Sequence, residues 1–194
     1  MSFIHPLEKE INCKIVYYGP ALAGKSTNLQ QISKKTSSGK QGKLVSLTNT
    51  EDRTLFFDFL PLSLQKVQGY SVRFHMYTVP GQVLYENSRK IIVKGVDGIV
   101  FVVDSQVERM EENLQSWKDL EANLKEQGLD LATLPLVIQY NKRDMSGVAP
   151  VEQLQKLFNK RDVPSFETVA SKGTGVLESL QAISKQVLRD LKKP

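Results

Sequence analysis

Two hydrophobic patterns alternate along this chain: continuous apolar runs, and apolar residues at helical spacing. Continuous apolar runs at residues 98–103 and 136–140 are typical of central parallel strands that are covered on both faces. The similar run at 11–18 predicts the first strand, and 166–169 predicts a short last strand. Apolar residues at helical spacing predict helices over 25–35, 107–127, 151–159 and 176–191. Because strands and helices alternate in this way, we expect an α/β fold.

A third pattern separates the first predicted helix from the run at 98–103. Residues 54–60 are rich in aromatic side chains. In residues 72–79 one face of a strand would carry Val72, Phe74, Met76 and Thr78, and the other would carry Arg73, His75, Tyr77 and Val79. Gly69 marks a turn between the two segments. They predict an antiparallel hairpin at one edge of the sheet, and 44–47 predicts another short strand. The predicted fold is therefore a mostly parallel, doubly wound sheet with one antiparallel edge hairpin. Such sheets bind ligands at the carboxyl ends of their parallel strands.

The loop after the first predicted strand has the pattern G-x-x-x-x-G-K-S. Its glycines let backbone N–H groups turn inward around a phosphate, and the following helix adds the positive end of its dipole. Lys25 is expected to reach the β- and γ-phosphates, and Ser26 to bind Mg²⁺. Glycine and proline also mark ordinary turns, so the flanking strand and helix are what favour a nucleotide site. The predicted phosphate-binding residues are Gly19, Ala21, Leu22, Ala23, Gly24, Lys25, Ser26 and Thr27.

A polar segment, Asn141-Lys142-Arg143-Asp144, follows the apolar run at 136–140 and falls on the same rim of the sheet. The Asp144 carboxylate can accept hydrogen bonds from N1–H and the exocyclic amine of guanine, a pair that adenine does not offer. Lys142 can lay its stem over the base, and Asn141 can bridge the base and the phosphate loop. A polar turn after a strand is the other interpretation, and the nearby phosphate loop counts against it. Ala170 and Ser171, after the last strand, offer a backbone N–H to the guanine O6.

The fourth motif, Thr78-Val79-Pro80-Gly81-Gln82, follows the second strand of the predicted hairpin. Gly81 has a backbone N–H that can approach a γ-phosphate. Gln82 is the residue type that orients an attacking water. This segment therefore predicts the site at which the terminal phosphate is hydrolysed.

These four motifs, in this order, resemble the Ras-like small GTPases over roughly residues 10–192. Residues 15–20, 52–61 and 77–82 resemble more closely the bacterial members that act in gliding motility and cell polarity. The resemblance implies a P-loop G domain that binds GTP and GDP with Mg²⁺ and hydrolyses GTP. It implies that Thr54 binds Mg²⁺ in the GTP form, that Arg53 stabilises charge on the transferring phosphoryl group, and that Gln82 positions water. The alternatives are an exposed loop charge for Arg53 and an ordinary strand start for Thr54.

The resemblance also implies partners. In the family the GTP form concentrates at a cell pole and recruits effectors, among them a response-regulator polarity protein. A roadblock-domain partner accelerates hydrolysis, and gliding or type IV pilus machinery lies downstream. These effectors and regulators are expected at the two switch loops.

Two positions depart from the general family pattern. Thr78 stands where most Ras-like proteins have the aspartate of D-x-x-G, and Asp58 is a possible substitute for that carboxylate. Ala21 stands where glycine lies against the γ-phosphate, so its methyl group is expected to slow hydrolysis. Two hypotheses follow: a GTP-hydrolysing switch, or a slow or non-hydrolysing guanine-nucleotide-dependent scaffold. A P-loop kinase is disfavoured by the Asn141–Asp144 segment and by the lack of an arginine-rich lid.

Composition limits the number of domains and the classes of partner. The 194 residues suit a single domain over 1–194, and the net charge of +5 comes from scattered lysines, which does not favour a nucleic-acid partner. We expect no membrane anchor, because the sequence has no apolar run of transmembrane length and no myristoylation or prenylation motif. The single cysteine, Cys13, is expected to be buried. A cytoplasmic protein fits these features, with enrichment at a cell pole implied by the resemblance.

Overall fold

The computed structural model describes residues 3–5, 9–36, 44–48, 54–67, 69–81 and 85–191, with the backbone alone at 3–5, 46–48, 54–57 and 63–67. Its strands are β1 (Phe3–His5), β2 (Glu10–Tyr18), β3 (Val45–Thr48), β4 (Thr54–Val67), β5 (Tyr70–Thr78), β6 (Gly98–Asp104), β7 (Leu136–Asn141) and β8 (Ser165–Glu167). Its α-helices are α1 (Lys25–Thr36), α2 (Glu86–Val93), α3 (Met110–Glu126), α4 (Val151–Phe158) and α5 (Val176–Asp190). Two 3₁₀ turns, η2 (Val107–Arg109) and η3 (Ala170–Lys172), complete the described elements.

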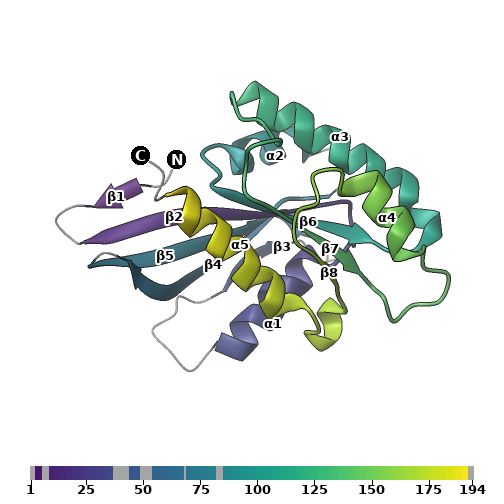
Figure 1. Cartoon of the computed structure of the whole chain (residues 1–194), viewed down its shortest axis with the longest axis horizontal. Helices are drawn as coiled ribbons and strands as arrows, with labels where there is room; N and C mark the ends of the chain where they lie inside the picture. The colour runs from purple at the N-terminus through teal and green to yellow at the C-terminus, as the bar shows by residue number, and fades with distance from the viewer. Residues whose placement is uncertain are drawn as a thin grey trace.

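One twisted sheet forms the centre of the molecule (Figure 1). The strand order is β3-β4-β5-β2-β6-β7-β8, and β1 pairs with the start of β2. The strands β5, β2, β6, β7 and β8 are parallel neighbours. β4 pairs antiparallel with β5, and β3 pairs antiparallel with β4 at the edge. The carboxyl ends of β2, β6 and β7 therefore meet on one rim, where the motif loops begin.

Helices cover both faces of the sheet (Figure 1). Side chains along β2 alternate between the two faces: Ile15 and Tyr17 belong to the core under α1 and α5, and Val16 and Tyr18 to the core under α2, α3 and α4. Because both faces are buried, a central parallel strand must be apolar at every position, and all of β6 is buried. This burial on both faces explains why continuous apolar runs indicate the central strands of this sheet.

The predicted fold class is confirmed. Each predicted strand and helix has a counterpart, and the hairpin at Gly69 is present as β4 and β5, with β4 longer than predicted. The predicted helix over 107–127 divides into η2 and α3. Cys13 is buried as expected. The patterns gave no prediction for β1, which is too short for a clear alternation, or for α2, which is an eight-residue helix with Ile91 73% exposed.

Candidate nucleotide site

The predicted phosphate loop lies between the end of β2 and the first residue of α1. The ammonium of Lys25 donates hydrogen bonds to the carbonyl oxygens of Gly19 (2.9 Å) and Pro20 (2.6 Å). The pKa of Lys25 is lowered to about 7, first by burial and then by the positive charge of Arg89, while Asp58 acts in the opposite direction. A bound phosphate would supply the negative charge that this buried lysine needs. The loop therefore has the electrostatics of an anion site.

Asn141 joins three segments around this loop. Its Nδ2 donates to the carbonyl oxygen of Ala23 at 2.7 Å. Its Oδ1 accepts from the Ala170 N–H at 2.9 Å and the Thr168 hydroxyl at 3.0 Å. A Cβ on Gly24 would lie 2.3 Å from Asn141 Nδ2, so only glycine allows this close approach. Asn141 thus fixes the phosphate loop, the end of β7 and the start of η3 relative to one another.

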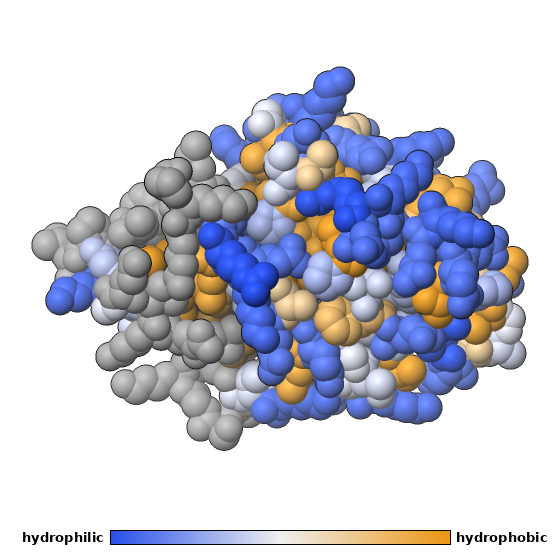
Figure 2. Space-filling view, viewed as in Figure 1, coloured by the Kyte–Doolittle hydropathy of each residue, from blue (hydrophilic) through white to orange (hydrophobic). Residues whose placement is uncertain are grey.

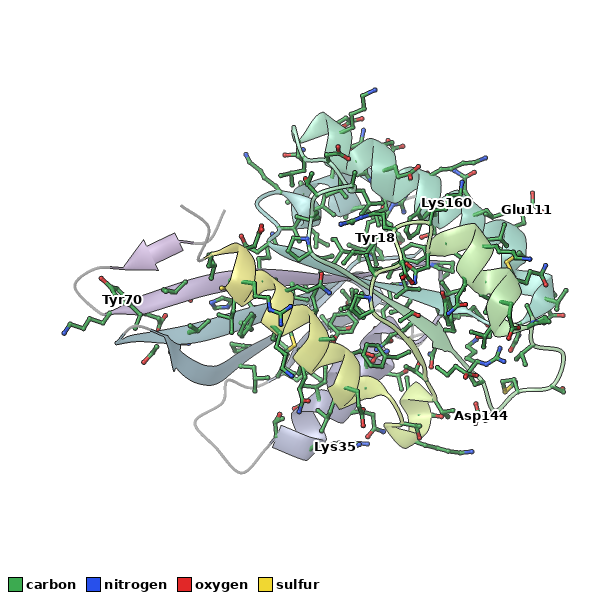
Figure 3. The ribbon with its side chains drawn as sticks, viewed as in Figure 1. Tyr18, Lys35, Tyr70, Glu111, Asp144 and Lys160 are labelled. Carbon is green, nitrogen blue, oxygen red and sulfur yellow. The ribbon has the colours of Figure 1, made fainter. Side chains whose placement is uncertain are left out.

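A cavity of about 250 Å³ lies between these segments. Asp144, in the loop after β7, is one of its lining residues, and its carboxylate lies 3.2 Å from the ammonium of Lys172 in η3. Figure 3 shows Asp144 beside η3. The cavity brings together residues that are more than 100 positions apart in the sequence. Its lining is Leu22, Gly24, Thr27, Asn141, Lys142, Asp144, Met145, Val169, Ala170 and Ser171.

Two residues that the sequence analysis missed connect the two motifs. Lys142 reaches the fully buried carboxylate of Asp104, with Nζ 2.7 Å from Oδ2. Arg109 of η2 donates to the carbonyl oxygen of Ala21 at 3.1 Å and lies 4.0 Å from the same Asp104 oxygen. Asp104 is the first polar residue after the apolar run of β6, on the motif rim, and that position could have identified it. Arg109 gives no comparable local signal, because its contact with the loop spans 88 positions.

The other side of the loop contacts the Thr78–Gln82 motif. A Cβ on Gly81 would lie 2.3 Å from the backbone nitrogen of Ala21, so glycine is required for this contact. A second cavity, of about 230 Å³, opens beside it, and Gly19, Pro20, Ala21, Gly81, Arg89 and Arg109 are among its lining residues. The predicted γ-phosphate side therefore has Gly81 directly against Ala21.

Comparisons with known proteins agree with this geometry. The model of the ADP-ribosylation factor family matches residues 1–187. The Mutual gliding-motility protein MglA of Myxococcus xanthus (strain DK1622) is 58% identical over 193 residues, which cover 100% of this chain and 99% of the relative. This chain is a Ras-like small GTPase. Eukaryotic relatives are more distant: Ras-related protein Rab-7a of Dictyostelium discoideum is 26% identical over 94% of this chain and 85% of its own, and RABG3f of Arabidopsis thaliana is 26% identical over 95% and 86%.

In this GTPase, Thr78 and Asp58 form one unit on neighbouring strands. The Thr78 hydroxyl donates to Asp58 Oδ2 at 2.9 Å and accepts from the Asp58 N–H at 2.8 Å. Both side chains are buried, and the Asp58 charge acts on Lys25. A carboxylate is thus present beside the threonine that replaces the usual aspartate, and it comes from β4 rather than from the motif itself.

The described part of the GTPase includes some of the predicted site residues and not others. Arg53 and Gln82 lie outside the described residues, and for Thr54, the first residue of β4, the backbone alone is described. Ser26 is the second residue of α1 and is partly buried. Among the described residues there is no cluster of three or more histidine, cysteine or carboxylate side chains that would hold a metal ion without a nucleotide. No helix in the described part of the chain is long and apolar enough to cross a membrane.

Proposed function

We propose that this GTPase is a nucleotide-dependent switch for cell polarity and motility. The observation that carries the proposal is the junction at Asn141, which joins the phosphate loop to the guanine motif. Gly19, Ala21, Leu22, Ala23, Gly24, Lys25, Ser26 and Thr27 would hold the phosphates, and Asn141, Lys142, Asp144, Ala170 and Ser171 the base. The 58% identical relative is a gliding-motility protein, which supports the biological role.

In the base pocket, Asp144 would exchange its contact with Lys172 for the two N–H donors of guanine. The Ala170 N–H is already donated to Asn141. We therefore expect the O6 contact from the N–H of Ser171, the next residue of η3, while Ala170 acts through Asn141. Adenine lacks the matching donor pair, so the pocket would discriminate against ATP.

Mg²⁺ fits the donor set on the phosphate side, since hard cations prefer oxygen ligands together with substrate phosphates. Ser26 would supply its hydroxyl, and Thr54 would add a second hydroxyl in the GTP form. The buried Asp58 carboxylate would accept hydrogen bonds from the ion's waters. The ion would neutralise charge on the β- and γ-phosphates, which is its general role in phosphoryl transfer.

Hydrolysis would use two residues outside the described part of the chain, with Gln82 positioning water and Arg53 stabilising the transferring phosphoryl group. Contacts of the γ-phosphate with the Gly81 N–H and with Thr54 would order the two switch loops. Partners would then distinguish the GTP form from the GDP form. Effectors at a cell pole, a response-regulator polarity protein and a roadblock-domain activator are the partners that the resemblance implies.

The decisive experiment is single-turnover GTP hydrolysis by the purified protein, together with its affinities for GTP, GDP and ATP. We expect tight binding of both guanine nucleotides, at least about 10²-fold weaker ATP binding, and measurable hydrolysis without a partner. Equal affinities for GTP and ATP would refute the guanine site. Absence of nucleotide binding would refute the interpretation of residues 19–26.

The contact between Gly81 and Ala21 favours a second candidate function, a slow or non-hydrolysing scaffold that docks polarity partners. The Ala21 methyl group sits in the loop that Gly81 closely approaches, and a displacement of about 1 Å near reacting atoms can cost about 10²-fold in rate. Tight guanine-nucleotide binding with negligible turnover, which candidate activators leave unchanged and Ala21→Gly raises, would favour the scaffold.

A further inference from the structure

A groove beside α3 faces away from the nucleotide site. Helix α3 separates two hollows: Glu112, Ser116 and Asp119 line the cavity next to the phosphate loop, and the face with Leu114 and Trp117 lines the groove. Side chains three or four positions apart share a face of a helix, so the two hollows lie on different sides of α3. The groove has a volume of about 810 Å³ and extends from α3 to the end of α4.

Its floor is apolar and packs against the core. The Trp117 ring packs edge-on against Phe101, with centroids 4.8 Å apart, and lies 5.9 Å from the ring of Phe158. Leu114, Leu129 and Leu157 are partly exposed around this tryptophan, and all three line the groove. A preformed floor of this kind suits apolar side chains from a partner.

The carboxylates around the floor have hydrogen-bond partners within the protein, and the exposed lysines around it have no carboxylate partner among the described residues. Both carboxylates are used within the protein: Glu121 accepts the indole N–H of Trp117 at 2.9 Å, and Asp130 accepts the N–H of Ala132 at 2.8 Å. The exposed lysines at the rim, Lys118, Lys125 and Lys160, have no carboxylate within ion-pair distance in the part of the chain that the structure describes. Figure 3 shows Lys160 between α3 and α4, and Figure 2 shows hydrophobic surface interleaved with hydrophilic surface over these helices.

We propose that this groove docks an acidic amphipathic segment of a partner protein. Apolar side chains of the segment would cover Trp117 and the leucines, and its carboxylates would face the three lysines. A neutral or basic segment would bring these lysines into a less solvated interface without a counter-charge, which is unfavourable. Charge complementarity therefore selects an acidic occupant.

The docked segment would not compete with a partner that reads the switches. Helix α2, which follows the residues of the predicted second switch, packs on the other side of α3, where Arg89 lies 3.6 Å from Asp119 and Lys90 lies 3.2 Å from Glu126. The groove thus lies on a different side of α3 from the predicted second switch. We expect the segment to bind the GDP form and a GTP-analogue form equally, so this proposal does not rest on the proposed switch function.

The test uses a synthetic 14-residue peptide with leucines at helical spacing and glutamates elsewhere, together with a matched peptide in which lysine replaces every glutamate. Trp117 is the only tryptophan of the chain, so its fluorescence reports directly on the groove. Titrations are run on the full-length protein and on the triple variant Lys118→Glu, Lys125→Glu and Lys160→Glu. The control variant is Lys34→Glu, Lys185→Glu and Arg189→Glu, which changes the net charge equally at exposed positions elsewhere.

We expect the acidic peptide to shift the tryptophan emission and to bind the groove variant at least about tenfold more weakly than the wild-type and control proteins. Raising the salt concentration should weaken this binding. The lysine peptide should show the reverse preference, for the groove variant. Equal binding of the two peptides to the wild type, no loss of acidic-peptide affinity in the groove variant, or no emission change up to about 1 mM peptide would each overturn the proposal.

Discussion

The ammonium of Lys142 lies 2.7 Å from the carboxylate of Asp104, which is fully buried at the end of β6. This pair holds the lysine of the guanine motif, and Asp104 also lies near Arg109, which binds the phosphate loop at Ala21. Asp104→Asn should therefore loosen both halves of the nucleotide site, because a partly buried lysine loses its counter-charge. We expect GDP to dissociate about tenfold faster, measured by stopped flow with a fluorescent GDP analogue.

The matched control for this prediction is Glu112→Gln. Glu112 is the other carboxylate that pairs with Arg109, and its side chain is 44% exposed. Its replacement should change GDP release less than twofold, as is usual for an exposed ion pair. A dissociation rate in Asp104→Asn that matches this control would show that the buried pair does not position the guanine motif.

A second prediction concerns base selection by Asp144. Asp144→Asn replaces an acceptor-only carboxylate with an amide, which cannot accept both donors of guanine but can donate to the extra carbonyl of xanthine. The affinity for GDP should fall by about 10²-fold or more and the affinity for XDP should rise, as measured by competition with the fluorescent analogue. Lys172→Ala, which removes the present partner of Asp144, serves as the control and should preserve the preference for guanine. An unchanged GDP/XDP ratio in Asp144→Asn would count against the assignment.

The sequence predicted the fold well because its strongest signals come from burial. The runs that became β6 and β7 are apolar throughout since helices cover both faces, and the phosphate loop was identified by its own local pattern. Asp104 and Arg109 were missed because their roles depend on long-range contacts: Arg109 reaches a carbonyl 88 positions away. The sequence suggested Asp58 as a substitute for the missing aspartate but did not predict its pairing with Thr78. A β-bulge between Ser63 and Gln65 shifts the register of the hairpin, and the pattern of residues gives no sign of it.

A third prediction concerns acid stability and His75. This half-buried residue of β5 stacks on Phe59 at a centroid distance of 5.6 Å, and its Nε2 lies 2.6 Å from Asn12 Oδ1. Burial, and then the charge of Arg73, lower the pKa of His75 below its ordinary value of 6.5, while Glu10 acts in the opposite direction. Below that value the unfolded chain binds more protons than the folded protein, so stability is lost as the pH falls.

His75→Gln removes this contribution. Thermal unfolding between pH 7 and pH 5 should show a shallower decline of Tm in the variant than in the wild type. Asn12→Ala, which keeps the histidine but removes its hydrogen-bond partner, should keep a pH dependence. A His75 pKa at or above about 6.5 in an NMR titration would contradict the prediction.

The rate of hydrolysis should respond to the side chain at position 21. Ala21→Gly removes the methyl group from the loop that Gly81 contacts, and we expect the single-turnover rate to rise about tenfold or more. Ala23→Gly makes the same change elsewhere in the loop, at a residue whose carbonyl binds Asn141, and should give no such acceleration. If both variants are equally fast, loop flexibility rather than crowding at the γ-phosphate sets the rate. If neither is faster, Ala21 does not limit hydrolysis.

The last prediction concerns the buried carboxylate of Asp58 on β4 and its neighbour Thr78 on β5. If the Asp58 carboxylate takes the place of the missing motif aspartate, Asp58→Asn should raise the Mg²⁺ concentration for half-maximal hydrolysis about tenfold, the loss usual for a residue that supports a metal site indirectly. The amide oxygen introduced by this substitution can still accept the Thr78 hydroxyl, so the fold should persist, which circular dichroism would check. Adding Thr78→Asp to Asp58→Asn should lower the Mg²⁺ concentration for half-maximal hydrolysis towards the wild-type value, because the carboxylate returns at a neighbouring position. Asp190→Asn, at the end of α5, controls for loss of a negative charge. A Mg²⁺ requirement that is unaffected by Asp58→Asn would leave the buried pair a purely structural link between the two strands.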